Sequence, residues 1–351
     1  MRFTRRAALA AGLSLTALGL AAPALAQAQP ARLKMVLNWK YQGPQSAFFI
    51  AQDKGYFKDE GIDLTIDQGE GSAASIVKVA QGSYDIGFGD INALVDIVSK
   101  RPGEDTPLAV YVMFNVPPFA IATRADGPIK TPKDLEGKTI GGPANDAALK
   151  LFPAFAKMAG IDASKVTITN MQPNLREQML MRGQVDAAFG FVNTISFSAK
   201  SAGMNVERDF RFIQYGDYGL DLYSNSIVVS RKLARENPKA VQGFLRALNR
   251  GVKDMLADPT GSTDYVMKRE PLLNRAVEVE RTIATIKMEM SHPEAAKVGI
   301  GDVDDERLKR SIGVVVEANG LPRAPAPEEF YTRAFLPPLA ERPTSVSAKT
   351  N

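Results

Sequence analysis

Short apolar segments alternate with segments of helical periodicity over most of this 351-residue chain. The first example has an apolar strand at Leu33–Leu37, a polar turn, a helix from about Ser46 to Lys54, and a second strand at Ile62–Ile66 that ends in a glycine-rich turn. Strands that alternate with helices in this way form βα units around a mostly parallel sheet. The sequence therefore predicts an α/β fold, in which ligands bind beyond the carboxyl ends of the strands.

Two parts of the chain repeat one pattern. Gly82–Gly89 (GSYDIGFG) is similar to Gly183–Gly190 (GQVDAAFG), and in each a helix-ending glycine is followed by an aspartate and a short buried strand. Pro117-Pro118 separates the two parts, and the helical segments after Ser230 need a surface to pack on, most simply the first part. We therefore expect two lobes, each a mostly parallel sheet flanked by helices, rather than one long sheet.

Residues 1–26 have the features of a secretory signal peptide. Arg2 and the Arg5-Arg6 pair precede a small apolar segment, and Ala24–Ala26 (ALA) fits a cleavage site. The arginine pair fits a twin-arginine signal, and a Sec signal that contains two arginines is the alternative. No cysteine follows the cleavage site, so the sequence predicts an exported protein without a lipid anchor.

Composition excludes several classes of function. The signal contains three arginines and no acidic residue, so the mature chain has 40 Lys and Arg and 39 Asp and Glu. Its net charge is therefore close to zero, and the sequence shows no basic surface for nucleic acid. The chain has no cysteine and one histidine, His292, which reads as a surface cap at a helix end. Thiol chemistry, a catalytic triad and a histidine-based metal centre therefore lack their residues. We expect no catalytic residue, no metal and no cofactor.

Candidate binding residues follow the first two strands. Trp39, the only tryptophan, comes after Asn38 at the end of the first strand, where its flat ring can stack on a planar ligand; a core position is the alternative. Gly69–Ala74 fits the G-x-G-x-x-A pattern of dinucleotide sites, but an exported protein has little access to NAD and the next strand is too short. The helix start at Gly71-Ser72 can still bind an anion or an acceptor atom, or it is a tight turn capped by Ser72.

Acidic and amide side chains also lie at helix starts in both parts. Asn145-Asp146 begins a helix in the second part, and Asp90 and Asn92 follow a strand in the first. A carboxylate that faces a cleft repels an anion and binds an amine or an amino-heterocycle. Helix capping is the alternative for Asp146.

Aromatic residues and charges mark three later segments. Tyr215 and Tyr218 lie in a glycine-containing segment with two aspartates, which suits a pocket wall or a hinge, and a solvated loop is the alternative. The charges at Glu278–Arg281 and Val303–Arg310 are expected on solvated helix faces.

These motifs together resemble one family. They are Asn38-Trp39, Gly55–Leu64 (GYFKDEGIDL), Gly69–Ser75, Gly82–Gly89 and Asp134–Gly141 (DLEGKTIG). From about 33 to 260 the chain is similar to the type II periplasmic solute-binding proteins for thiamine-pyrimidine precursors, nitrate, sulfonates and taurine. The resemblance implies a discontinuous first lobe at 32–119 plus 223–340, a second lobe at 120–222, and a hinge of two crossings beside an interlobe ligand cleft. The Pro-, Ser- and Lys-rich end of the chain, 341–351, is expected to be a flexible tail.

The resemblance also implies a role and a set of site residues. A monomer in the periplasm would capture a small solute by hinge closure, with no bond made or broken, and deliver it to the permease subunits of an ABC importer in the inner membrane. By the family's pattern the cleft would be lined by Asn38, Trp39, Gly71, Ser72, Asp90, Asn92, Asn115, Asn145, Asp146 and Asn193.

The ligand is left open at this point. Trp39, Tyr215, Tyr218 and Asp146 favour a planar, nitrogen-containing solute such as an aminopyrimidine. Against this, Lys40-Tyr41-Gln42 follows the tryptophan, with no clear counterpart of the acidic residue that pyrimidine binders use there. A sulfonate, nitrate or an aromatic acid is the alternative, with Lys40 as its charge partner.

Two other roles are known or conceivable for proteins with the same lobes. The family also contains pyrimidine synthases that consume their own histidine beside a cysteine-rich iron site, which this chain does not have. A ligand-binding partner of a membrane sensor is a further alternative.

Overall fold

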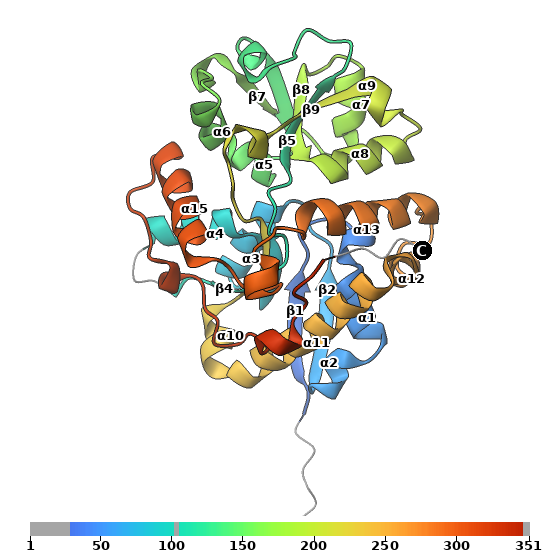
Figure 1. Cartoon of the computed structure of the whole chain (residues 1–351), viewed down its shortest axis with the longest axis vertical. Helices are drawn as coiled ribbons and strands as arrows, with labels where there is room; N and C mark the ends of the chain where they lie inside the picture. The colour runs from blue at the N-terminus through green and yellow to red at the C-terminus, as the bar shows by residue number, and fades with distance from the viewer. Residues whose placement is uncertain (1–28, 102–104, 347–351) are drawn as a thin grey trace, which may run out of the picture.

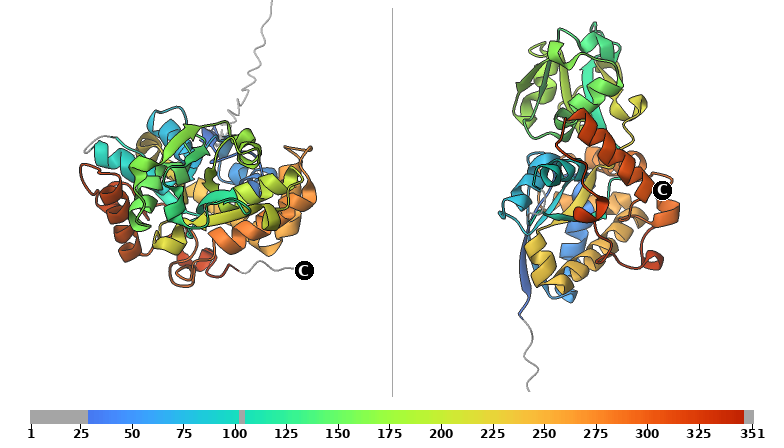
Figure 2. Two further views of the ribbon diagram at one scale, coloured as in Figure 1. Left: turned by 90° about the horizontal axis from the view of Figure 1, so that it is seen from above. Right: turned by 90° about the vertical axis from the view of Figure 1, so that its left-hand side faces the viewer.

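The chain forms two lobes, each built on a five-stranded sheet with helices around it (Figure 1). The structure is a computed structural model that describes residues 29–101 and 105–346. The predicted signal peptide lies outside the described residues. Figure 2 shows the two lobes stacked along the long axis of the molecule when it is seen from the side. The expected two-lobed α/β fold is confirmed.

The first sheet has the strand order β2-β1-β3-β10-β4. β1, β2 and β3 are parallel, and β10 is antiparallel to both of its neighbours, β3 and β4. The strands are β1 (Ala31–Val36), β2 (Ile62–Asp67), β3 (Ile86–Asp90), β4 (Leu108–Val112) and β10 (Asn225–Val229).

The second sheet repeats this arrangement in the order β7-β6-β8-β5-β9. β6, β7 and β8 are parallel, and β5 is antiparallel to β8 and β9. The strands are β5 (Phe119–Arg124), β6 (Thr139–Gly142), β7 (Thr167–Asn170), β8 (Ala187–Phe191) and β9 (Phe210–Gln214).

The repeated sequence motif has the same structural role in each lobe. In the first lobe Asp85 accepts a hydrogen bond from the backbone N–H of Lys34 at 2.8 Å, and its own N–H donates to the carbonyl of Lys34 at 3.0 Å. In the second lobe Asp186 makes the same pair of bonds with Thr139, at 2.8 and 2.9 Å. In each lobe the aspartate directly precedes a strand, β3 or β8. Its two bonds therefore fix the register of that strand against its neighbour, β1 or β6.

Helices cover the faces of both sheets. The first lobe has α1 (Ser46–Asp53), α2 (Tyr56–Asp59), α3 (Ser72–Ala80) and α4 (Ile91–Lys100), and the second has α5 (Ala147–Lys150), α6 (Phe152–Met158), α7 (Arg176–Met181), α8 (Val192–Ser201) and α9 (Val206–Asp209). The C-terminal segment has α10 (Arg231–Glu236), α11 (Pro238–Ala257), α12 (Pro259–Met267), α13 (Arg275–Glu289), α14 (Ala295–Val298) and α15 (Asp305–Ala318).

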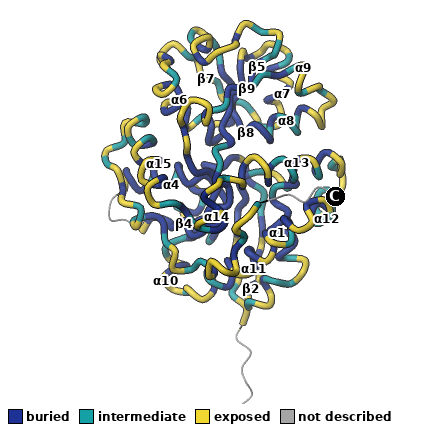
Figure 3. The backbone as a smooth tube through the Cα atoms, viewed as in Figure 1, coloured by how far each residue is buried: buried dark blue, intermediate teal, exposed yellow. Residues whose placement is uncertain are grey.

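The C-terminal helices pack on the first lobe, and two of them also reach the second. α11 packs against α1, whereas α13 lies along the face that is turned toward the second lobe and contacts α8 (Figure 1). α15 packs between α4 of the first lobe and α6 of the second. The central strands of both sheets are buried, whereas the edge strand β7 and the outer helix faces are exposed (Figure 3).

The described part of the predicted loose tail is held in place. The buried Arg342 side chain donates to the carbonyls of Pro337, Gly299 and Ile300, and the carbonyl of Glu341 accepts from Asn249. Glu341 and Arg342 are therefore anchored to the first lobe.

No helix within 29–101 and 105–346 combines the length and the apolar character needed to cross a membrane. Within the same ranges no three His, Cys, Asp or Glu side chains gather as a metal-binding group.

Candidate functional site

Two small cavities lie between the lobes, and both are lined by Asn38, Trp39, Phe191 and Thr194. We call them the Arg176 cavity, completed by Ser72, Asp146 and Arg176, and the Glu289 cavity, completed by Gln42, Pro44, Gln45, Phe114, Asn193, Arg281, Thr285 and Glu289. Each has a volume of about 10 Å³, the space of one water molecule. Ligand pockets usually enclose about 300–1,000 Å³, so the lobes must separate, or Trp39 must turn, before a ring can enter.

Two larger hollows lie beside these cavities. One, of about 450 Å³, is lined by Asp90, Asn92 and Asn145 together with residues of α3, α4, α5 and α15. The other, of about 790 Å³, is lined by Lys40, Glu70 and Asn145 and by the segment 170–174.

Trp39 is positioned by the glycine turn that follows β2. The backbone N–H of Gly69 donates to the carbonyl of Trp39 at 2.8 Å, and that of Gly71 donates to the carbonyl of Asn38 at 3.1 Å. A Cβ at Gly69 would lie 1.9 Å from the carbonyl oxygen of Leu37, so only glycine allows this approach. The half-buried ring of Trp39 then meets the guanidinium of Arg176 from the other lobe, 5.8 Å from the ring centroid.

Arg176 is the buried cation of its cavity, with 1% of the residue exposed. Its Nε and Nη2 donate to Glu177 Oε1 at 3.0 and 2.7 Å, and its Nη1 lies 3.9 Å from Asp146 Oδ2. Asp146 also caps α5, because its Oδ1 accepts from the N–H of Ala148 at 2.8 Å. Burial raises the pKa of Asp146, and Arg176 opposes that shift. The guanidinium is therefore already paired within its own lobe.

One face of α13 lines one side of the Glu289 cavity. Glu278, Arg281, Thr285 and Glu289 follow each other at intervals of three or four residues, so their side chains share that face. Arg281, 2% exposed, donates from Nε to Glu278 at 3.2 Å and from Nη1 to Gln42 at 3.0 Å. Its charge is therefore neutralised within the first lobe.

Glu289 and Thr285 have fewer partners than Arg281. Glu289 Oε1 accepts from Asn193 Nδ2 of the second lobe at 2.9 Å, and burial raises the pKa of the Glu289 carboxyl to about 8. Thr285 Oγ1 is buried and has no hydrogen-bond partner among the described residues. Both side chains line the same cavity and offer polar atoms to it.

Asp90 adds another buried carboxyl group to the interlobe region. Its Oδ1 accepts from the N–H and the side-chain amide of Asn92, at 3.0 and 2.7 Å, which caps α4. Burial raises the pKa of Asp90 to about 7, and Asp146 of the other lobe contributes to the shift. The lobes are therefore close enough for carboxyl groups on opposite sides to affect each other.

Other contacts also show that the lobes are closed. A Cβ at Gly71 would lie 2.4 Å from the carbonyl oxygen of Asn145, across the interface. Lys200 of α8 pairs with Glu280 of α13. Asn145 is exposed here and borders both larger hollows.

The structure places the predicted site residues in three groups. Five line the small cavities, namely Asn38, Trp39, Ser72, Asp146 and Asn193. Four border the larger hollows or the lobe contact, namely Gly71, Asp90, Asn92 and Asn145. Three line none of the four spaces, namely Asn115, Tyr215 and Tyr218.

The two tyrosines belong to the packing of the second lobe and not to a cleft wall. Tyr215 is fully buried, stacks on Phe155 at 4.2 Å between centroids, and donates its hydroxyl to the carbonyl of Ala148 at 2.8 Å. Tyr218 is 37% exposed and contacts Phe155 edge-on. Their interpretation as pocket residues is corrected by this placement, because Phe155 supplies a stacking partner that sequence alone does not reveal.

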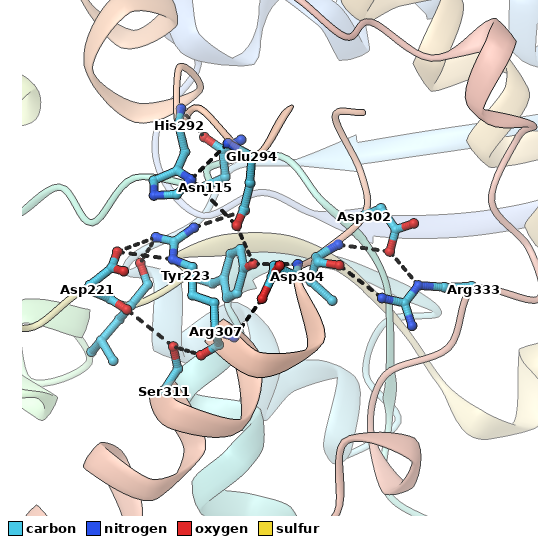
Figure 4. A network of polar contacts seen from close by, with 12 residues as sticks. Asn115, Asp221, Tyr223, His292, Glu294, Asp302, Asp304, Arg307, Ser311 and Arg333 are labelled. Atoms are coloured by element: carbon cyan, nitrogen blue, oxygen red, sulfur yellow. Dashed lines mark hydrogen bonds and ion pairs between the residues drawn. The ribbon is translucent and has the colours of Figure 1, made fainter. Parts of the chain in front are cut away.

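Asn115 lies at the hinge, where two stretches of chain cross between the lobes. The N–H groups of Met113 and Phe114 donate to the carbonyl of Asn225, and the N–H of Ser224 donates to the carbonyl of Phe114. Asn115 Oδ1 accepts from the N–H of His292 at 3.0 Å, so it joins the hinge to the segment after α13 (Figure 4).

A buried polar network supports the same hinge. Arg307 of α15 donates from Nη1 to Glu294 at 2.9 Å and from Nη2 to Asp221 at 2.7 Å, and its guanidinium lies 4.2 Å from the ring centroid of Tyr223 (Figure 4). The Tyr223 hydroxyl donates to Glu294 at 2.9 Å and accepts from the N–H of Asp304 at 2.8 Å. The network fixes the returning crossing to α14 and α15.

Two expectations about charged segments were wrong. Glu278, Arg281 and Arg307 were expected on solvated helix faces but are buried, because the second lobe and the hinge cover those faces. The reasoning from sequence also missed Arg176, Thr285 and Glu289 as cavity residues. The spacing of Glu278, Arg281, Thr285 and Glu289 on one helix face was the available signal, whereas Arg176 had none.

Comparisons with known proteins agree with this architecture. The family model described as NMT1/THI5 like matches residues 44–262, more than half of the chain. An alkanesulfonate-binding protein, SsuA from Xanthomonas axonopodis pv. citri, has the same fold, with a TM-score of 0.68 at 19% identity over 87% of this chain and 99% of that one. At that identity the likeness concerns the fold.

Curated relatives carry both binding and enzyme names. The riboflavin-binding protein RibY of Chloroflexus aurantiacus is 24% identical over 90% of each chain. The formylaminopyrimidine-binding protein of Halalkalibacterium halodurans is 22% identical over 73% of this chain and 78% of its own. A 4-amino-5-hydroxymethyl-2-methylpyrimidine phosphate synthase of Aspergillus parasiticus is 21% identical over 74% of this chain and 78% of its own. The chain belongs to the NMT1/THI5-like family and has the two-lobed periplasmic-binding-protein fold.

Proposed function

We propose that this protein is the periplasmic solute-binding component of an ABC importer and captures a small, planar, nitrogen-containing solute between its lobes. In this role a monomer without a cofactor closes on the solute and presents it to permease subunits in the inner membrane. The paired hinge crossings and the small cavities at the lobe interface support capture by closure.

The buried charged groups between the lobes are the main reason for the class of ligand that we propose. Two guanidiniums, Arg176 and Arg281, lie among five buried carboxyl groups, namely Asp90, Asp146, Glu177, Glu278 and Glu289. Both guanidiniums are already paired with a carboxylate of their own lobe. A nitrate, sulfonate or carboxylate would find both guanidiniums already paired and would face the carboxyl oxygens, whereas a neutral or basic heterocycle supplies N–H donors to those oxygens.

Trp39 supports the planar part of the proposal. Its ring borders both small cavities and lies beside Phe191, so a flat solute that enters here meets an aromatic surface. Lys40, the residue considered as a partner for an anion, is exposed beside the larger outer hollow. Two relatives, named as a riboflavin-binding and a formylaminopyrimidine-binding protein, are consistent with a flat nitrogen heterocycle.

A synthase activity has less support. His292 lies at the hinge, where its Nδ1 accepts from the N–H of Glu294 at 3.2 Å. It lines neither of the two small cavities. The chain contains no cysteine. We therefore propose a binding role without catalysis.

A thermal-shift screen of residues 27–351 tests the proposal. The compounds are aminopyrimidines, flavin fragments, alkyl and aryl sulfonates, nitrate and aromatic acids, because a ligand that binds only the folded state raises the melting temperature. We expect a shift with a flat nitrogen heterocycle that is lost in Trp39→Ala. A shift with sulfonates or nitrate that survives Asp146→Asn, and none with heterocycles, contradicts the proposal.

A further inference from the structure

Glu289 touches three parts of the molecule at once. It is the last residue of α13, and its backbone carbonyl accepts from the N–H of Val116 in the first hinge crossing at 3.0 Å. Its Oε1 accepts from Nδ2 of Asn193, on α8 of the second lobe, at 2.9 Å. The residue is 3% exposed. Because α8 belongs to the other lobe, separation of the lobes breaks the Asn193 bond and admits water to the Glu289 carboxyl.

The closed cavity has no free cation for an ionised Glu289. Apart from Glu289 itself, Arg281 is the only charged residue among the described residues that line this cavity, and it is engaged by Glu278 and Gln42. The cavity volume of about 10 Å³ leaves room for a single water molecule. One amide N–H and one water replace only part of the hydration of a carboxylate, so the closed form favours the neutral acid.

Charged groups on the elements of the second lobe and after α13 are engaged elsewhere. Arg176 pairs with Glu177 at 2.7 Å, and Lys200 of α8 pairs with Glu280 of α13. Burial lowers the pKa of His292, which follows α13, so its imidazole is neutral at pH 7. None of these three basic side chains therefore compensates a charge on Glu289.

The first lobe and the hinge network present the same situation. α12 packs against α13, and its Asp264 pairs with Arg275 at the start of α13, about four turns away from Glu289. On the hinge side Arg307 pairs with Glu294 at 2.9 Å. Among the described residues the carboxyl of Glu289 thus accepts one hydrogen bond, and that bond comes from the uncharged amide of the other lobe.

We propose that Glu289 is a proton-dependent latch of the closed lobes. The lobes close with the neutral carboxylic acid against Asn193, and loss of the proton to solvent favours their separation, because water then hydrates the carboxylate. The proton passes between the carboxyl and water, and no other covalent bond forms or breaks. This inference goes beyond the proposed function, since it concerns the lobes without a solute.

Closure changes the proton affinity of Glu289. In the closed form burial raises the pKa of its carboxyl to about 8, whereas the ordinary value of a glutamate is 4.5. Between these two values the closed form keeps a proton that the open form has released. The contribution to closure is therefore fully present below about pH 4.5 and is lost as the pH rises through 8. Between pH 6 and pH 8 the equilibrium constant for closure should fall by about 50-fold.

Asp90 titrates in the same direction at another point of the lobe interface. Burial raises the pKa of its carboxyl to about 7, and Asp146 of the second lobe contributes to the shift. Its effect on closure is therefore largely complete at pH 7, whereas that of Glu289 continues to higher pH. Between pH 7 and pH 9 we expect about a tenfold change from Glu289 and about a twofold change from Asp90.

Small-angle scattering of the solute-free mature protein at pH 6, 7, 8 and 9 tests the inference. We expect the radius of gyration to increase with pH as the lobes separate. The emission of Trp39 should change in parallel, because its half-buried ring borders both small cavities. Glu289→Gln keeps a carbonyl that accepts from Asn193 but cannot ionise, so its radius should change little between pH 7 and pH 9.

A matched variant and a second measurement support the test. Glu306→Gln changes an exposed glutamate of α15 and should keep the pH response of the parent protein. If Glu289→Gln does not fold, ¹³C NMR of labelled glutamate carboxyls in the parent protein should show one group that titrates near pH 8. In Gly71→Ala, whose Cβ would meet Asn145 across the interface, that group should titrate at the ordinary pH of a glutamate.

The outcomes are distinct from those that test the proposed function. A radius that is unchanged from pH 7 to pH 9 in the parent protein, or an equal change in Glu289→Gln, overturns the latch. Titration of the Glu289 carboxyl at the same pH in the parent protein and in Gly71→Ala also overturns it. Because no solute is present, a failed solute screen contradicts the binding role and leaves this result standing.

Discussion

Replacement of Arg307 by methionine should destabilise the protein strongly although the residue lies far from the cavities. The residue is 2% exposed, and its guanidinium donates to both Glu294 and Asp221. Glu294 is buried, so loss of the guanidinium leaves its carboxylate without a compensating cation, which costs about 3–5 kcal/mol in comparable pairs. The Asp221 side chain is 55% exposed and adds at most about 1 kcal/mol.

The expected loss is therefore about 3–6 kcal/mol of unfolding free energy. For a chain of this size, about 2 °C of melting temperature corresponds to each kcal/mol, so the midpoint should fall by about 6–12 °C. Urea unfolding, followed by far-UV circular dichroism and by the fluorescence of Trp39, measures the change. Burial already raises the pKa of Glu294, and loss of Arg307 raises it further, so the penalty should shrink as the pH is lowered toward 5 and the carboxyl is protonated.

Lys309→Met is the matched control on the same helix. Lys309 pairs with Glu306 at 3.0 Å, but both side chains are exposed, so we expect a change below about 0.5 kcal/mol. Adding Glu294→Gln to Arg307→Met removes the uncompensated charge and should recover a large part of the loss. A loss below about 1 kcal/mol in Arg307→Met, or no recovery in the double variant, would refute the reasoning.

Three further predictions concern the interlobe region. Trp39→Ala should weaken binding of a planar solute by about tenfold or more in calorimetry, and Trp39→Phe by less, because a smaller ring remains; equal affinities would contradict stacking. Gly71→Ala should hold the lobes apart, since its Cβ would meet Asn145 at 2.4 Å and its φ is +147°; small-angle scattering should show a larger radius of gyration, unlike Gly313→Ala, where the space is open. Asp90→Asn should flatten the pH dependence of stability: burial raises the pKa of Asp90 from 3.8 to about 7, so stability present below pH 3.8 is lost as the pH rises to about 7, by at most about 1.4 kcal/mol per pH unit. Urea unfolding at several pH values measures this, and identical profiles for the variant and the parent would contradict it.

The order of strands and helices could be predicted because each of these elements is encoded by its own short segment of the sequence. Each strand of both sheets begins within a residue or two of an apolar segment that is visible in the sequence, and the repeated Asp85 and Asp186 identify equivalent positions. Trp39 could be predicted at the lobe interface because the end of β1 must lie at the ligand edge of a parallel sheet.

The polar interior of the interface could not be predicted in the same way. Arginine and glutamate are rarely buried unless they are paired, so a charged helix face is normally assigned to solvent. Whether Arg281 and Arg307 are covered depends on where α8 and the hinge lie, and these segments are distant in sequence. Tyr215 shows the same limit, because its partner Phe155 lies sixty residues earlier.

The place of β10 in the first sheet sets the order in which that sheet can be completed. β10 lies between β3 and β4, although more than a hundred residues, including every strand of the second sheet, separate it from β4 along the chain. Until residue 225 is available, β3 and β4 lack their shared neighbour and present open edges that can pair with other chains. Closing so long a loop is slow, so we expect the second lobe to fold early and the first lobe to reach its native state last, with aggregation concentrated in that interval.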